Sequence, residues 1–182
     1  MRKWAMAFVA MAATPAAAQE ADYSRFTYGP VFADNGPVAD VAVTTPIPAD
    51  AQFRVAFDAA RASDGVEANP TLVSAARLIN MHARAGLARD ATQVAVVVHG
   101  RATPDLLNAR AYAARNEGAA NPSAELVGLL LDSGVRIILC GQSAAGSGVD
   151  ETADLLPGVE VALSAMTAHA MLQQQGYTVN PF

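Results

Sequence analysis

Apolar runs alternate with helical patterns from about residue 53 to the end of the chain. The clearest run is 94–98, whose residues are all apolar, as is typical of a strand covered on both faces of a sheet. Strands are also predicted over 53–57, 135–140 and 159–163, with a short last strand at 177–179.

Helices are predicted between these strands. Asn69-Pro70 supplies an N-cap and a first-turn proline for a helix that runs to about Ala85. Further helices are predicted over 103–116, 121–133 and 167–175. Strands separated by helices of this length predict right-handed crossovers. The expected fold is therefore a doubly wound α/β domain in three layers, with a mostly parallel sheet of about five strands.

The first residues have the pattern of a secretory signal peptide. Arg2 and Lys3 form a charged start, 4–13 is apolar, and 16–18 is an A-x-A cleavage site. The apolar stretch is too short to span a bilayer, so no membrane span is expected. We expect cleavage before Gln19 and export, and the alanine-rich, lysine-poor composition favours a bacterial periplasm.

The pattern divides the chain into three regions. Residues 1–18 are the predicted signal peptide, 19–52 an extended N-terminal arm, and 53–182 the α/β domain. The arm is rich in Pro, Gly, Asp and aromatic residues and has no sustained helical period, so we expect it to lie on the domain or on a neighbouring subunit. About 164 residues remain after cleavage, which is enough for a single hydrophobic core.

Charge narrows the range of partners. Cleavage at residue 18 removes the only lysine and leaves ten arginines against seventeen acidic residues. Without lysine, the mature chain has no residue for a Schiff base or for a phosphate-binding P-loop. Its acidic balance also argues against binding to a nucleic-acid backbone.

Cys140 is the only cysteine, and it ends a predicted buried strand. Open parallel sheets bind ligands outside the carboxyl ends of their strands, which is where this thiol would lie. A lone cysteine in an oxidising compartment cannot form an internal disulfide. It is therefore buried as a small apolar residue, paired between molecules, modified or reactive.

Several polar residues are expected at the same edge of the sheet. Gly141, Gln142 and Ser143 follow Cys140, and their backbone N–H groups could hold an anion. His99 ends the second strand, where an imidazole could lower the pKa of the thiol or orient a substrate, although a histidine that only ends a strand is commoner. Ser164 and Thr167 follow the fourth strand, and Thr167 is also a candidate N-cap.

Spacing argues against other sites. The segment 141–146 lacks the glycine two residues after serine that a nucleophile elbow requires, and Ser143 would obstruct a dinucleotide. His82, His99 and His169 lie on three different elements without paired ligand spacing, so no metal site is expected. No cofactor is expected for thiol chemistry at Cys140 either. His82 is interpreted as a packing residue, and His169 as a surface or site-rim residue.

Several motifs resemble one known family. The segments 97–100, 139–143, 155–159, 162–166 and 173–177 are similar to the DsrE/DsrF-like family, which includes TusD-related sulfur-relay subunits. The resemblance spans about 53–182. It implies a doubly wound α/β domain, assembly as a homotrimer or homohexamer, and a cysteine, here Cys140, that carries sulfur as a persulfide. The relay members are cytoplasmic, whereas this chain has an export signal.

The favoured hypothesis is an exported sulfur carrier or sulfurtransferase-type relay protein. Its Cys140 would accept sulfur from a donor protein or a small sulfur compound and pass it to an acceptor, with His99 as a base that tunes the thiol. One alternative is a non-catalytic, oligomeric binding or assembly module with a packed cysteine. Another is a redox sensor that forms an intermolecular disulfide through Cys140.

Overall fold

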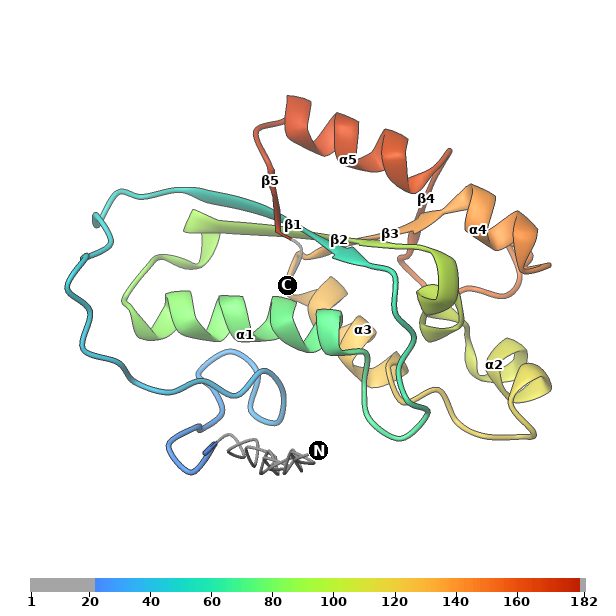
Figure 1. Cartoon of the computed structure of the whole chain (residues 1–182), viewed down its shortest axis with the longest axis horizontal. Coiled ribbons are helices and arrows are strands. Elements are labelled where there is room, and N and C mark those ends of the chain that lie inside the picture. The colour runs from blue at the N-terminus through green and yellow to red at the C-terminus, as the bar shows by residue number, and fades with distance from the viewer. Residues whose placement is uncertain (1–21, 181–182) are drawn as a thin grey trace, which may run out of the picture.

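The computed structural model describes residues 22–180 and contains a parallel five-stranded sheet (Figure 1). Its order is β4-β3-β2-β1-β5, and every neighbouring pair is parallel. The strands are β1 (Phe53–Ala59), β2 (Thr92–Val98), β3 (Arg136–Cys140), β4 (Glu160–Ala162) and β5 (Thr178–Asn180). The predicted fold class is confirmed. The predicted signal peptide lies outside the described residues.

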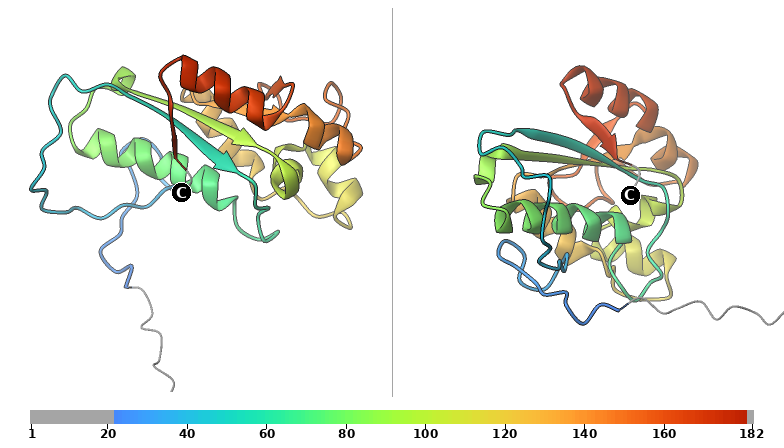
Figure 2. Two further views of the ribbon diagram at one scale, coloured as in Figure 1. Left: turned by 45° about the horizontal axis from the view of Figure 1, so that its top comes forward. Right: turned by 60° about the vertical axis from the view of Figure 1, so that its left-hand side comes forward.

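Helices cover both faces of the sheet. On one face are α1 (Pro70–Arg84), α2 (Ala109–Arg115) and α3 (Ala124–Asp132), and on the other is α5 (Ala165–Gln174), as Figures 1 and 2 show. Short 3₁₀ helices span Arg89–Ala91 (η1) and Gly100–Leu106 (η2). The chain steps from β1 to β4 and then returns through α5 to β5 at the opposite edge, which makes the domain doubly wound. No helix within residues 22–180 has the length and apolar character needed to cross a membrane.

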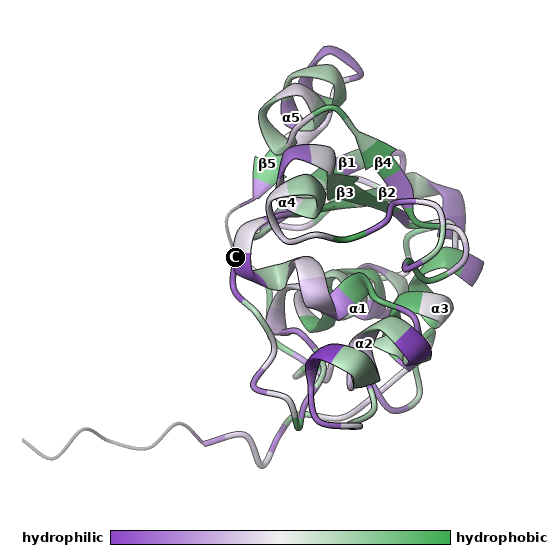
Figure 3. Cartoon of the chain, turned by 90° about the vertical axis from the view of Figure 1, so that its right-hand side faces the viewer, coloured by the Kyte–Doolittle hydropathy of each residue, from purple (hydrophilic) through white to green (hydrophobic). Residues whose placement is uncertain are grey.

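The central strand β2 is buried on both sides, as its continuous apolar run predicts. Val94, Val96 and Val98 face the larger core under α1 and α3, whereas Ala95 and Val97 face the smaller core under α5. Side chains alternate along a strand, so a continuous apolar run supplies both cores. In Figure 3 the central strands have the hydrophobic colour.

Two segments fold differently from the sequence prediction. The segment 103–116 is not one helix, because η2 ends at Leu106 and α2 begins at Ala109. Between them Leu107 bridges to Leu155, and the Asn108 side chain accepts a hydrogen bond from the N–H of Ala111 as an N-cap. The residues after Cys140, interpreted as turn-prone, form a short helix, α4 (Gly141–Gly146).

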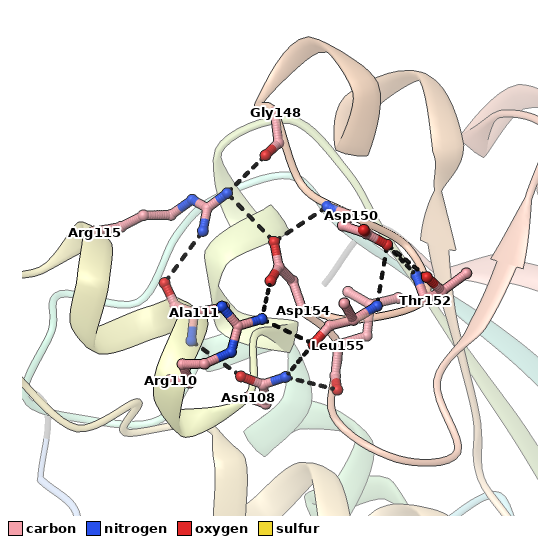
Figure 4. Close-up of polar contacts among 10 residues, drawn as sticks. Asn108, Arg110, Ala111, Arg115, Gly148, Asp150, Thr152, Asp154 and Leu155 are labelled. Atoms are coloured by element: carbon pink, nitrogen blue, oxygen red, sulfur yellow. Dashed lines mark hydrogen bonds and ion pairs between the residues drawn. The ribbon is translucent and has the colours of Figure 1, made fainter.

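The long connection from α4 to β4 is fastened to α2 (Figure 4). Asp154, which is buried, forms an ion pair with Arg110 at 2.7 Å and a longer one with Arg115 at 3.6 Å. Asp150 accepts hydrogen bonds from Thr152 and from the N–H of Ala153, which closes the turn before Asp154. These contacts fix the loop that leads from the Cys140 region to β4.

The described part of the N-terminal arm lies along α1 of its own chain (Figure 1). Asn80, which is fully buried, accepts hydrogen bonds from the N–H groups of Val31 and Phe32 and donates to three carbonyl groups of 32–36. Arg84 donates to the carbonyl oxygens of four arm residues. The arm thus adds Phe32 to the larger core without a second subunit.

Candidate functional site

The carboxyl ends of β2, β3 and β4 bring together the residues expected there. Cys140 ends β3 and is paired in register with Ala162 of β4. On the other side, Val98 pairs with Leu139, so His99 follows at the level of Cys140. Strand alternation places His99, Cys140 and Ala162 on the sheet face covered by α5.

Cys140 is only 5% exposed, and hydrogen bonding by Ser143, Ala165 and Gln142 influences its thiol. Burial, the largest single influence, raises the pKa of this thiol. The Ser143 hydroxyl and the backbone N–H groups of Ser143, Ala165 and Gln142 oppose it, and together they lower the pKa below the ordinary value of 9.0. The net result favours the thiolate, which is the nucleophilic form of cysteine.

Ser143 links the segments that follow β2 and β3. Its Oγ accepts a hydrogen bond from the N–H of Gly100 at 2.9 Å, and its hydroxyl is a hydrogen-bonding group that lowers the pKa of Cys140. Gln142 contributes its backbone N–H to the thiol, whereas its side chain donates to the carbonyl oxygen of Leu163 at 3.3 Å. Both residues therefore position the end of β3 between its neighbours.

Gly141 allows β4 to approach the end of β3. A Cβ atom at this position would lie 2.9 Å from the carbonyl oxygen of Ala162, closer than ordinary van der Waals contact. A side chain at this position would push β4 away from the start of α4. The requirement for glycine is therefore steric.

Ser164 and Thr167 lie at the start of α5, beside the site. The Ser164 Oγ accepts from the N–H of Thr167 at 3.1 Å and contacts the Thr167 hydroxyl at 3.0 Å. Ser164, not Thr167, is thus the N-cap, and the helix begins two residues earlier than predicted. The cap orients the N–H of Ala165, which is one of the donors to Cys140.

The sequence alone did not identify Asp58 as a site residue, and it did not identify His169 as the partner of Asp58. Asp58 of β1 contacts His99 Nε2 at 3.1 Å and His169 Nε2 at 2.7 Å. Burial raises the pKa of this carboxyl, but the hydrogen bonds from His169 and His99 outweigh that effect and lower it. The signal for Asp58 in the sequence was an acidic residue directly after the strand predicted over 53–57.

His82 lies apart from this cluster. Its ring packs against Phe53, with centroids 4.6 Å apart, and Nδ1 bonds to the Thr92 hydroxyl at 2.7 Å. Burial lowers the pKa of its imidazole. Among residues 22–180, no group of three metal-ligating side chains has the arrangement of a metal site.

Two hollows adjoin the carboxyl edge. One, of about 290 Å³, runs between α5 and β4 and includes Leu163 and Thr167 in its lining. The other is an open groove that passes Gly100, Arg101 and Ser143. Exposed apolar side chains of Leu163 and Met166, at 73% and 81%, flank the corner that carries the Ala165 N–H.

The family model of the DsrE/DsrF-like family matches residues 41–181. The chain belongs to this family. Two solved structures are similar to it across 72% of this chain and 100% of their own: the protein of unknown function MTH1491 from Methanobacterium thermoautotrophicum, at 22% identity and a TM-score of 0.54, and the ychN protein from E. coli, at 18% and 0.52. At these identities the likeness establishes the fold alone. No curated protein matches the sequence.

Proposed function

We propose that this DsrE/DsrF-like protein is an exported sulfur carrier whose Cys140 thiolate accepts a sulfane sulfur atom and passes it on. The observation that carries the proposal is the set of donors around Cys140, namely the Ser143 hydroxyl and three backbone N–H groups. A thiol that only fills space has no use for several donors directed at its sulfur. A thiolate or a persulfide anion does.

The chemistry requires no cofactor. The Cys140 thiolate attacks the outer sulfur of a donor persulfide, R–S–SH, and forms a new S–S bond. The S–S bond of the donor breaks, its electron pair leaves with the donor sulfur as R–S⁻, and the outer sulfur stays on Cys140 as Cys–S–SH. The donor is a protein or a small sulfur compound, and an acceptor thiol takes the sulfur in a second exchange.

The 5% exposure of Cys140 favours a second candidate, a binding or assembly module in which the cysteine is packed. The same burial opposes the redox-sensor alternative, since an intermolecular disulfide needs two sulfur atoms at bonding distance. Alkylation by iodoacetamide separates the first two functions. We expect native Cys140 to react at neutral pH at least as fast as the denatured chain, and the Cys140→Ser variant not to react at all. Much slower reaction of the native thiol at every pH would support the packed residue.

Export to the periplasm is proposed from the pattern of residues 1–18. Mature protein recovered from its host should begin at or near Gln19. An intact Met1 on soluble protein would contradict export.

Assembly into a homotrimer or homohexamer is proposed from the apolar surface around the edge strand β4. Val161, Leu163, Met166 and Met171 are all exposed there, at 45–81%. An edge strand with exposed apolar neighbours is a common place of association. Light scattering should give a trimer or a multiple of it, and the replacement of Leu163 and Met166 by serine should weaken the assembly. A wild-type monomer at micromolar concentration would contradict the proposal.

A further inference from the structure

Asp58, His99 and His169 form a polar cluster on the sheet face that carries Cys140. Asp58 comes from β1, His99 from the end of β2, and His169 from α5. His99 Nε2 lies 3.1 and 3.2 Å from the two carboxylate oxygens, and His169 Nε2 lies 2.7 Å from Oδ1. The Asp58 carboxylate thus holds two imidazole rings, and each ring uses its Nε2 atom for the contact.

We propose that Asp58, itself fixed by His169, is a positioning residue that orients His99 to take up and return the proton exchanged when sulfur moves to or from Cys140. The inference rests on the proposed sulfur-carrier function and adds how the proton is handled. It assigns His99 to the reacting atoms, and Asp58 and His169 to its orientation.

The contacts fix the protonation pattern of both rings. A carboxylate only accepts hydrogen bonds, so each Nε2 carries a proton and donates a hydrogen bond to Asp58. Each Nδ1 is then the nitrogen that can take a further proton. Asp58 is suited to this role because its hydrogen bonds lower the pKa of the carboxyl despite burial, so it stays charged at neutral pH.

The two rings differ in what a further proton would cost. His169 Nδ1 is buried and has no hydrogen-bond partner, so an added N–H there would be desolvated and unpaired. The His99 side chain is 29% exposed, so its protonated form remains hydrated. The proposal therefore assigns proton exchange to His99, and assigns to His169 the hydrogen bond that holds Asp58.

His99 follows the strand that lies next to the one ending in Cys140. His99 continues the extended course of β2, since its N–H donates to the Ala59 carbonyl oxygen at 2.9 Å. The β2–β3 register puts it level with Cys140, and neighbouring parallel strands are about 4.8 Å apart. The next residue, Gly100, donates to the Ser143 hydroxyl that serves Cys140. The His99 ring contacts Asp58, which also holds His169, and the register places Cys140 on the neighbouring strand.

Transfer to an acceptor thiol, R–SH, needs such a base. The acceptor sulfur bonds to the outer sulfur of Cys140–S–SH while the bond from that atom to Sγ breaks. The electron pair leaves with Sγ as the Cys140 thiolate, R–S–SH departs, and the proton of the acceptor thiol passes to His99 Nδ1. In the loading direction the same proton returns to the departing thiolate of the donor. General acid–base assistance of this kind contributes typically about 10²–10⁴-fold.

Two acceptors with different proton requirements test the proposal. Wild-type protein is loaded with inorganic polysulfide, and sulfur transfer from Cys140 is followed to 2-mercaptoethanol, which must lose a proton, and to sulfite at mildly alkaline pH, which brings none. The readout is the ratio of the two rates at each pH of a mildly alkaline series. Because both acceptors use the same loaded cysteine, the ratio cancels a general loss of structure at the site.

For Asp58→Asn we expect the thiol-to-sulfite rate ratio to fall by about tenfold or more. His99→Gln, which leaves the Asp58–His169 contact in place, should give the same loss, and His169→Gln a smaller one. Asp34→Asn, on the exposed arm, is the matched control and should keep the wild-type ratio. An unchanged ratio in both Asp58→Asn and His99→Gln would overturn the proposal, even if both rates fell. If wild-type Cys140 took up no sulfur, the sulfur-carrier function itself would fail, and the role of His99 with it.

Discussion

Ser143→Ala is the most informative single substitution in the site, because it removes one donor to Cys140 and leaves the strand end in place. The Ser143 hydroxyl is the strongest of the donors that lower the pKa of the thiol. A hydrogen bond to a charged group contributes about 1.5–3 kcal/mol. The site is only 5% exposed, so water replaces the lost donor poorly.

That energy translates into a loss of thiolate. Since about 1.4 kcal/mol corresponds to a factor of ten, the variant should hold at least about tenfold less thiolate at neutral pH. The pKa of Cys140 should rise, and the pH profile of iodoacetamide alkylation should move to higher pH. The Gly100 N–H also loses its acceptor, but Gly100 is exposed and water can replace that bond.

Alkylation followed by mass spectrometry, over a pH series, measures this shift directly. Ser147→Ala is the matched control, since it removes an exposed hydroxyl at the end of the same short helix. It should leave the profile in place. If Ser143→Ala and Ser147→Ala gave the same profile as the wild type, hydrogen bonding to the thiolate could not be what activates Cys140.

Three further outcomes follow from the fold. Gly141→Ala should destabilise the domain by about 1–3 kcal/mol in urea unfolding, because the new Cβ would meet the Ala162 carbonyl oxygen. Gly146→Ala has open space around its Cβ and should be neutral or slightly stabilising. Equal effects of the two substitutions would refute the steric argument. Asn80→Ala should lower the free energy of unfolding by about 3 kcal/mol and expose the arm to proteases, because it leaves the buried backbone groups of Phe32 unpaired. Unchanged proteolysis of 29–38 would contradict the conclusion that Asn80 holds the arm in place. The pKa of Cys140 is lower in the folded protein than the ordinary 9.0. The stability of the wild type relative to Cys140→Ser should therefore increase as pH rises through the folded pKa, and it should level off above about pH 9. A stability difference that does not change with pH would mean that folding does not stabilise the thiolate.

The sequence was sufficient for the architecture because the relevant signals are local. The apolar run of β2 predicts burial on both faces, and Asn69-Pro70 marks the start of α1, where the Asn69 side chain indeed accepts from the N–H of Thr71. Cys140 could be placed at the edge of the sheet for the same reason. A strand end is visible in the local pattern.

The partners across the sheet could not be predicted in this way. Asp58, His99 and His169 lie on three elements separated by up to 111 residues, and only the strand order brings them together. The helix over 103–116 failed because a bridge between Leu107 and Leu155 fixes an extended backbone within a helical pattern. Tertiary contacts decide both cases.

Mass spectrometry of native protein exposed to inorganic polysulfide, without reductant, tests the central claim most directly. We expect an added mass of roughly 32 Da, one sulfur atom, on Cys140, resolved at high mass accuracy from two added oxygens. The adduct should disappear on treatment with an acceptor thiol and be absent from Cys140→Ser. A native wild-type chain that gains no sulfur, while its denatured form does, would contradict the claim that Cys140 carries sulfur.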